Sequence, residues 1–429
     1  MAPDQPAQAR RTATALRKFA GVQALNVKRD AIALRPFNRD EFGTEPASPS
    51  EAHIQAANQL IINLRTPLLK LADQVSQTAK DSANEPGPQH LRSLLLQKER
   101  ALRWIKLTEQ TWDYYLELFG QRQSRFADWL LASDRIALDC YQAVYTGLGR
   151  ARSIPAPPPF AYMETGFTPA TFRRGVPLTR LGRRANPFPI IKLPYHRLVN
   201  PWTLGAIHHE VSHNLQSDLD LWQEVPRRIN HRLRRAGMNE MVASIWTRWH
   251  KEMWADLCGL LLGGPAIVGS LMDVVARSPI ITKAYNPAGV HPTPYLRILI
   301  NLELLRRMGF PVEADTFCQL WQRLYPSPRQ SNIPRTLLDT FPKANHLVVD
   351  TICFQPYRQL GDKSLAEVVR FRPDYQKMIQ EAAQRIASGT DPGIIPARFL
   401  VSAARYAVEH KLARPGQITQ NFYQALVKR

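Results

Sequence analysis

The stretch HHEVSH, residues 208–213, is the part of this chain from which the fold can be worked out. Asn200 and Pro201 lie shortly before it and favour a helix start, because Asn caps a first turn and Pro fits the first helical position. With about 100° of rotation per residue, the apolar positions that follow fall on one narrow stripe. This stripe comprises Leu204, Ile207, Val211 and Leu215. His209 and His213 lie one turn apart on nearly the opposite side of the predicted helix.

The two histidines have the spacing of a metal-binding pair. Imidazoles one helical turn apart can hold one zinc ion at bond lengths of about 2.0 to 2.1 Å. Glu210 projects about 100° round from His209, where its carboxylate can reach metal-bound water without ligating the metal. His208 falls back toward the apolar stripe, so we expect it to have a structural role. A polar helix face without a metal is the alternative that remains open until a third ligand is found.

Two known positions for a third ligand are excluded by the residues that occupy them. A catalytic zinc site needs three protein ligands and an open position for water. The metzincin pattern needs Gly and His shortly after the second histidine, where this chain has Gln216 and Leu219. An aminopeptidase-like spacing needs Glu at the position of Arg232.

The stretch KEMWADLCGLLLGGP, residues 251–265, supplies the missing acid in a predicted helix. Glu252 follows His213 by 252 − 213 = 39 residues, and we expect it to be the third ligand. Asp256 lies one turn later and is expected to accept a hydrogen bond from a ligand histidine, fixing its tautomer. Ala255 and Gly259 share this helix face and are small enough to let two helices approach closely.

The segments HEVSH (209–213) and EMWAD (252–256) together resemble the gluzincins, the thermolysin-type zinc peptidases. The resemblance implies one zinc per chain, with His209, His213 and Glu252 as ligands. It also implies Glu210 as general base, Asp256 as the residue supporting a ligand histidine, and a peptide or protein as substrate. The same chemistry serves other amide hydrolyses, so the residues alone indicate a zinc hydrolase and the resemblance indicates a peptidase.

The stretch VHPTPYLR, residues 290–297, offers side chains for the remaining catalytic role. A zinc hydrolase needs a further donor to stabilise the oxyanion that forms as water adds to the carbonyl. Thermolysin-like enzymes use His and Tyr donors from outside the metal ligands, so His291 and Tyr295 are the candidates, with His291 preferred. Arg297 is expected to hold a substrate carboxylate through two hydrogen bonds. In the alternative interpretation His291 only shapes the loop and Tyr295 packs.

Periodicity along the chain predicts a mainly α (α+β) fold, with a zincin-like catalytic core that contains a small sheet and is flanked by helical regions. The best strand candidate is FPIIKLP, residues 188–194. The predicted regions are a loosely ordered basic and polar arm, a helical region, the zincin-like core, and a C-terminal helical region that completes the active-site cleft. Their bounds are 1–46, 47–150, 151–275 and 276–429, respectively.

Charge and composition leave a second class of function open. The chain has 56 Lys and Arg against 36 Asp and Glu, a formal net charge of +20. Such a balance suits nucleic acid or an anionic surface, but the basic residues are spread along the chain and no zinc finger, RNA-recognition signature or glycine-rich phosphate loop accompanies them. The alternatives are therefore a basic nucleic-acid or anionic-surface binding protein, and a catalytically inactive zincin that acts as a scaffold. Retention of Glu210 favours an enzyme.

The remaining features bear on location. No stretch approaches the roughly 18 to 20 apolar residues of a membrane span, and the N-terminus lacks the apolar core of a secretory signal. The four cysteines are widely spaced and form no CxxC pair. This pattern is typical of a reducing compartment, so we expect a cytoplasmic protein. The oligomeric state and the substrate sequence are not determined by these patterns.

Overall fold

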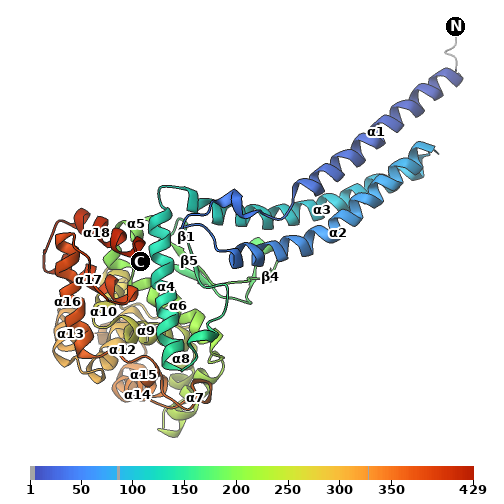
Figure 1. Ribbon diagram of the computed structural model, residues 1–429. Coiled ribbons are helices and arrows are strands. Elements are labelled where there is room, and N and C mark those ends of the chain that lie inside the picture. Colours follow the sequence, from blue (N-terminus) through green and yellow to red (C-terminus); the bar gives the residue numbers. More distant parts are fainter. Residues whose placement is uncertain (1–4, 85–86, 327) are drawn as a thin grey trace. The chain divides into compact units, whose positions relative to one another are not determined.

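The computed structural model describes residues 5–84, 87–326 and 328–429 (Figure 1). Helices make up most of these residues, and the strands form one three-stranded and one two-stranded sheet. The predicted fold class, mainly α with a small sheet, is confirmed. The chain divides into two compact units, of which the first runs to Ala127 and includes Gly175–Pro187. The second comprises Asp128–Arg174 and Phe188–Arg429.

The first unit is built on three long helices. Its elements are α1 (Gln5–Ala33), η1 (Arg39–Phe42), α2 (Glu51–Asn84), α3 (Pro88–Gly120), η2 (Gln121–Gln123), β3 (Pro177–Leu178), η4 (Thr179–Leu181) and β4 (Arg184–Ala185). One buried stripe of α1 packs in a common core with α2 and α3. This stripe consists of Ala20, Ala24, Val27 and Ala31, and Leu34 continues it just after the end of the helix.

The loosely ordered arm predicted for residues 1–46 is therefore wrong over residues 5–33, which are helical. The physical reason is the small size of the buried residues: a stripe made mostly of alanine carries a weak apolar signal, yet it lets helices pack closely. Residues 1–4 lie outside the described part of the chain.

The second unit holds the remaining helices and the three-stranded sheet. Its helices are α4 (Ala127–Gly147), η3 (Ala151–Ser153), α5 (Tyr195–Val199), η5 (Pro201–Thr203), α6 (Gly205–Asp218), α7 (Glu224–Arg235), α8 (Glu240–Arg248), α9 (His250–Gly263), α10 (Ala266–Val275), α11 (Pro279–Thr282), α12 (Pro294–Arg307), α13 (Pro311–Leu324), η6 (Pro328–Gln330), α14 (Arg335–Cys353), η7 (Arg358–Leu360), α15 (Leu365–Val368), α16 (Pro373–Ser388), α17 (Ala397–Glu409) and α18 (Pro415–Val427). Among the described residues, no helix is both long and apolar enough to span a bilayer.

These units do not follow the predicted boundaries at residues 150 and 275. The segment 175–187, predicted inside the core region, joins the first unit because its turn packs against α3: a Cβ added at Gly182 would lie 2.3 Å from Leu107 Cδ1. Helices on both sides of residue 275 share one hydrophobic core, so the predicted core and C-terminal regions form a single unit.

The small sheet has the order β1–β5–β2. β1 (Phe160–Met163) runs parallel to β5 (Ile190–Leu193), and β2 (Ala170–Phe172) is antiparallel to β5. β5 lies within the strand predicted at 188–194. Because β2 is an edge strand of this sheet, only one of its sides pairs with a neighbouring strand.

Helices α6 and α9 cross at close range in the centre of the second unit. The predicted apolar stripe of α6 is fully buried, as expected, while its other side faces α9. A Cβ added at Gly259 of α9 would lie 3.4 Å from backbone atoms of His208 and His209. The small residue at 259 therefore permits the close helix approach that the sequence predicted.

Helix α17 contacts the first turn of α6 and the last turn of α9. The ring Nε2 of His208 donates to the carbonyl of Arg398 at 3.0 Å, which confirms a structural contact for this histidine. Arg398 Nε and Ser402 Oγ donate to the last carbonyls of α9, at Leu262 and Gly263. The two bonds to α9 satisfy carbonyls that the end of a helix leaves without partners, and the three bonds together connect α6 and α9 to α17.

Candidate metal centre

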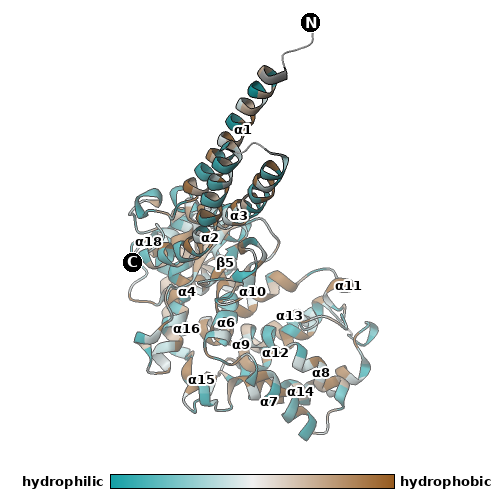
Figure 2. Ribbon diagram, turned by 90° about the vertical axis from the view of Figure 1, so that its right-hand side faces the viewer, coloured by the Kyte–Doolittle hydropathy of each residue, from teal (hydrophilic) through white to brown (hydrophobic). Residues whose placement is uncertain are grey.

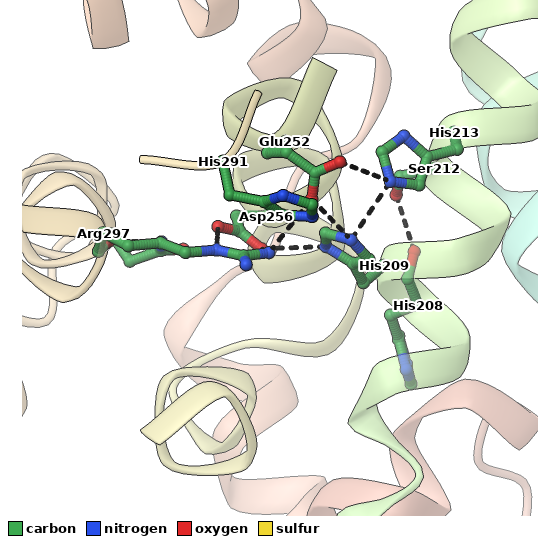
Figure 3. A network of polar contacts seen from close by, with 9 residues as sticks. His208, His209, Ser212, His213, Glu252, Asp256, His291 and Arg297 are labelled. Atoms are coloured by element: carbon green, nitrogen blue, oxygen red, sulfur yellow. Dashed lines mark hydrogen bonds and ion pairs between the residues drawn. The ribbon is translucent and has the colours of Figure 1, made fainter. Parts of the chain in front are cut away.

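Three predicted metal ligands meet where α6 faces α9 (Figure 3). The Nε2 atoms of His209 and His213 lie 3.1 Å apart. Glu252 places one carboxylate oxygen 3.4 Å from His209 Nε2 and the other 3.6 Å from His213 Nε2. This His–His–Glu group can hold a metal ion.

The separations are close to those around a tetrahedral ion. Bonds of about 2.0 to 2.1 Å in tetrahedral geometry place neighbouring ligand atoms about 3.3 to 3.4 Å apart. The His209–His213 separation of 3.1 Å lies near this value. The two Glu252 distances, 3.4 Å to His209 and 3.6 Å to His213, belong to different carboxylate oxygens, either of which can serve as the ligand atom. Two imidazole nitrogens that face each other so closely need a proton or a metal ion between them, since two bare nitrogen lone pairs repel.

Asp256 fixes the orientation of His209. The Nδ1 atom of His209 lies 2.8 Å from Asp256 Oδ1, as predicted for the residue that supports a ligand histidine. Because a carboxylate accepts at Nδ1, the other ring nitrogen is left with its lone pair directed at the metal position. Arg297 in turn donates to both oxygens of Asp256, at 2.5 and 2.8 Å.

Buried charge dominates the electrostatics of the centre. Burial alone raises the pKa of Asp256, but the Arg297 guanidinium and the His209 hydrogen bond outweigh burial and lower this pKa to about 2. Burial likewise opposes ionisation of Glu252, and contacts with His209 and His291 outweigh it, so the pKa of Glu252 lies well below its usual range. Two buried carboxylates thus stay ionised beside one guanidinium. Burial lowers the pKa of His209, but hydrogen bonds with both carboxylates outweigh burial and raise this pKa to about 10, so a proton on His209 balances the second negative charge. A bound metal cation can take the place of this proton.

Glu210 lies beside the three ligands without belonging to them. It is buried on α6 and lines the same cavity. Burial is the main cause that raises the pKa of Glu210 to about 7, against the lowering effect of His209. Within the described residues, no hydrogen bond or ion pair engages its carboxylate. The carboxylate is therefore available to exchange a proton near neutral pH.

Two of the three ligands, His209 and Glu252, line a cavity of about 490 Å³. One wall is apolar and comes from α10 and α11. It consists of Ile267, Leu271, Val274, Val275 and Ile281. The sequence did not reveal this wall, because α10 is apolar on most of its circumference and periodicity does not show which side faces a cavity.

His291 lies at the cavity, as expected for a donor. Its Nε2 atom is 3.2 Å from Glu252 Oε2, and 60% of its side chain is exposed. Tyr295, the other candidate, is only 5% exposed and packs in the hydrophobic core, where it does not line the cavity. The prediction of Tyr295 as a donor is therefore corrected. His291 lies in the loop before α12, whereas Tyr295 lies in the first turn of α12 and packs in the core.

Arg297 also departs from its predicted role. It lines the cavity, but the residue is only 9% exposed, and its guanidinium is paired with Asp256 and lies 3.5 Å from Glu252. If the guanidinium left Asp256 to bind a substrate carboxylate, a buried ion pair would be broken, at a cost of about 3 to 5 kcal/mol. Arg297 is therefore a residue that positions Asp256, and the assignment to substrate binding is corrected.

No family model, curated protein or solved structure matches this chain. The resemblance to gluzincins accordingly rests on the two short segments 209–213 and 252–256 and on the geometry around them.

The centre is expected to bind one divalent ion per chain. Replacing Glu252 with Ala removes a ligand and the charge beside both histidines, so we expect most of the metal to be lost. The matched control is Glu303→Ala, which removes a carboxylate paired with an exposed histidine on α14. Elemental analysis after dialysis measures the metal. Metal-free wild-type protein, or equal metal in both variants, would contradict the assignment.

The hydrogen bond from His209 to Asp256 is expected to strengthen metal binding. Asp256→Asn keeps the shape but weakens this bond and the pairing with Arg297, so metal affinity should fall by about 10- to 100-fold. Competition with a chromogenic chelator measures the affinity. Asp350→Asn is the control, because Asp350 also pairs with two arginines, Arg232 and Arg307, away from the centre. Equal affinity in the two variants would show that Asp256 has no special role.

Proposed function

We propose that this protein is a zinc-dependent metallopeptidase. The observation that carries the proposal is the His209–His213–Glu252 group, whose ligand atoms lie within 4.8 Å of one another, with Glu210 lining the same cavity as His209 and Glu252. Two imidazoles and one carboxylate are a ligand set typical of catalytic zinc, and borderline-soft nitrogen donors disfavour magnesium and calcium. The set leaves a fourth position for water.

Zinc, when bound, polarises the scissile carbonyl and lowers the pKa of water toward 7. Glu210 then acts as general base: it takes the proton of the attacking water and passes it to the leaving amine. A general base works best when its pKa lies near the working pH, and burial brings the pKa of Glu210 to about 7. Asp256 and Arg297 hold His209 in place throughout, because both are buried and paired.

His291 is placed to donate to the developing oxyanion. Its ring lies beside Glu252 at the cavity and keeps most of its surface exposed, so it can turn toward a substrate carbonyl. A donor positioned where negative charge develops stabilises the transition state more than the substrate. The proposal therefore keeps His291 in the mechanism and omits Tyr295.

A peptide substrate is supported by the sheet next to the cavity. Thr168 and Pro169 line the cavity and lead directly into the edge strand β2. Extended peptides bind edge strands through main-chain hydrogen bonds, and the apolar wall from α10 offers a place for an apolar side chain. A small amide would use neither feature.

We also propose a cytoplasmic location. All four cysteines are free thiols, and Cys140, Cys258 and Cys353 are buried. Proteins of oxidising compartments more often pair their cysteines in disulfides.

Glu210→Gln is expected to separate binding from turnover. Gln keeps the shape of Glu but cannot accept the proton of the attacking water, so kcat should fall by about 10²- to 10⁴-fold while metal content stays unchanged. Cleavage of a mixed peptide library, followed by mass spectrometry, measures turnover. If the variant cleaves at the wild-type rate, the proposed base is wrong. If the wild-type protein cleaves no peptide although it holds zinc, the chain is an inactive zincin.

His291→Ala tests the oxyanion donor. We expect kcat to fall by about 10²- to 10³-fold, the usual loss for one such donor, with metal content unchanged. His346→Ala is the matched control, since His346 is similarly exposed and also pairs with a glutamate. A near-normal kcat for His291→Ala would exclude this residue from the mechanism, and loss of metal would make it a ligand.

A further inference from the structure

Helix α1 has a second ordered face besides the one that it buries. On the side opposite the buried stripe, positions spaced alternately four and three residues apart form a line along the helix. We name this line the outer face: Arg11, Ala15, Lys18, Val22, Leu25, Arg29 and Ile32. All seven residues are exposed. Such spacing is that of the contact positions in a coiled coil.

The outer face contains apolar side chains that the first unit does not cover. Val22 is 50% exposed, Leu25 55% and Ile32 50%. Together they place three branched apolar side chains on one line, where burial against a partner would stabilise a complex by the hydrophobic effect. Single exposed apolar residues need no explanation, but a line of them at coiled-coil spacing does.

The same line is strongly basic. Arg11, Lys18 and Arg29 alternate with the apolar residues, and α1 has no acidic residue from Gln5 through Arg29. In the part of the chain that the structure describes, none of these three cations forms an ion pair. The nearby pair of Lys28 with Asp73 lies on the flank of the helix that faces α2.

The first half of α1 has few contacts within its own unit. It runs past the ends of α2 and α3 (Figures 1 and 2). Its first buried residue is Ala20, so none of the side chains described from Ala7 to Phe19 is buried. A helical segment of about this length that buries no side chain is by itself only marginally stable in water. A partner along the outer face would therefore stabilise the helix itself.

We propose that the outer face of α1 binds an acidic amphipathic helix of another protein in a coiled-coil-like contact. Leucines of the partner would cover Val22, Leu25 and Ile32, and its carboxylates would pair with the cations between them. This proposal concerns the first unit alone and is independent of the proposed peptidase activity.

Other occupants fit the face less well. A second copy of this chain would bring three further cations into the contact, where like charges repel. A bilayer would bury the middle of the outer face, and there Lys18 and Arg29 share the line with Leu25, which places charges toward hydrocarbon. Nucleic acid would pair with the cations but would leave the apolar side chains without a use.

The test uses the full-length protein and a synthetic four-heptad peptide with Leu and Glu at its contact positions. A peptide of the same composition with the heptad order scrambled is the control ligand. We expect fluorescence anisotropy to show binding of the ordered peptide only. Leu25→Asp and Lys18→Glu should each weaken it by at least about tenfold, the loss typical of a central interface residue. Both residues are exposed, so thermal stability should stay unchanged.

Matched variants keep the test specific. Leu96→Asp changes a leucine that is 62% exposed on α3, and Arg17→Glu changes an exposed cation on α1 beside the outer face. Both should bind the ordered peptide like the wild-type protein. Absence of binding, equal binding of the scrambled peptide, or equal losses in all four variants would overturn the proposal. Three other results would also overturn it. The two outer-face substitutions could abolish binding to phosphatidylserine vesicles, they could abolish binding to duplex DNA, or they could abolish self-association measured by sedimentation; these results would identify a membrane, a nucleic acid or a second copy of the chain as the occupant.

Discussion

The close packing of α6 against α9 is the constraint on which the rest of the candidate site depends. A tetrahedral ion requires ligand atoms about 3.3 to 3.4 Å apart, so the ends of the ligand side chains from both helices must meet at one point, which fixes how far apart the helices can lie. A small residue at 259 suits this spacing, because even a Cβ added to Gly259 would already be in van der Waals contact with the backbone of His208 and His209, at 3.4 Å. The apolar stripe of α6 and the contacts of both helices with α17 hold the pair in this position.

Burial of charge is the second consequence of this packing. Glu252, Asp256 and Arg297 all lie in the interior, where an unpaired charge is costly. Arg297 compensates one carboxylate and Asp256 orients His209, which leaves Glu252 and the two imidazoles with an affinity for a cation. A core built for stability alone would replace these groups with apolar side chains, since buried ion pairs contribute little net stability. Their presence supports a functional site.

The predictions that had to be corrected share one cause: each depended on which neighbour a side chain would meet. Arg297 is one turn from the loop that holds His291, as expected, yet its guanidinium turns to a buried aspartate instead of a substrate. Tyr295 lies in the first turn of α12 but faces the core. Residues 5–33 have the low hydropathy of a loose arm, and only the alanine stripe packed against α2 and α3 shows why they form a helix.

What the sequence by itself determined is local: the helix at HEVSH, the opposite placement of its apolar stripe and its two histidines, and the acid pair of α9 at a spacing of one turn. These follow from helical periodicity and from ligand chemistry, which depend on neighbours a few residues apart. The apolar cavity wall from α10, the Arg297–Asp256 pair and the division into two units were decided only by the tertiary structure. They join residues far apart in the chain, and the pattern of a single segment does not contain the position of its distant neighbours.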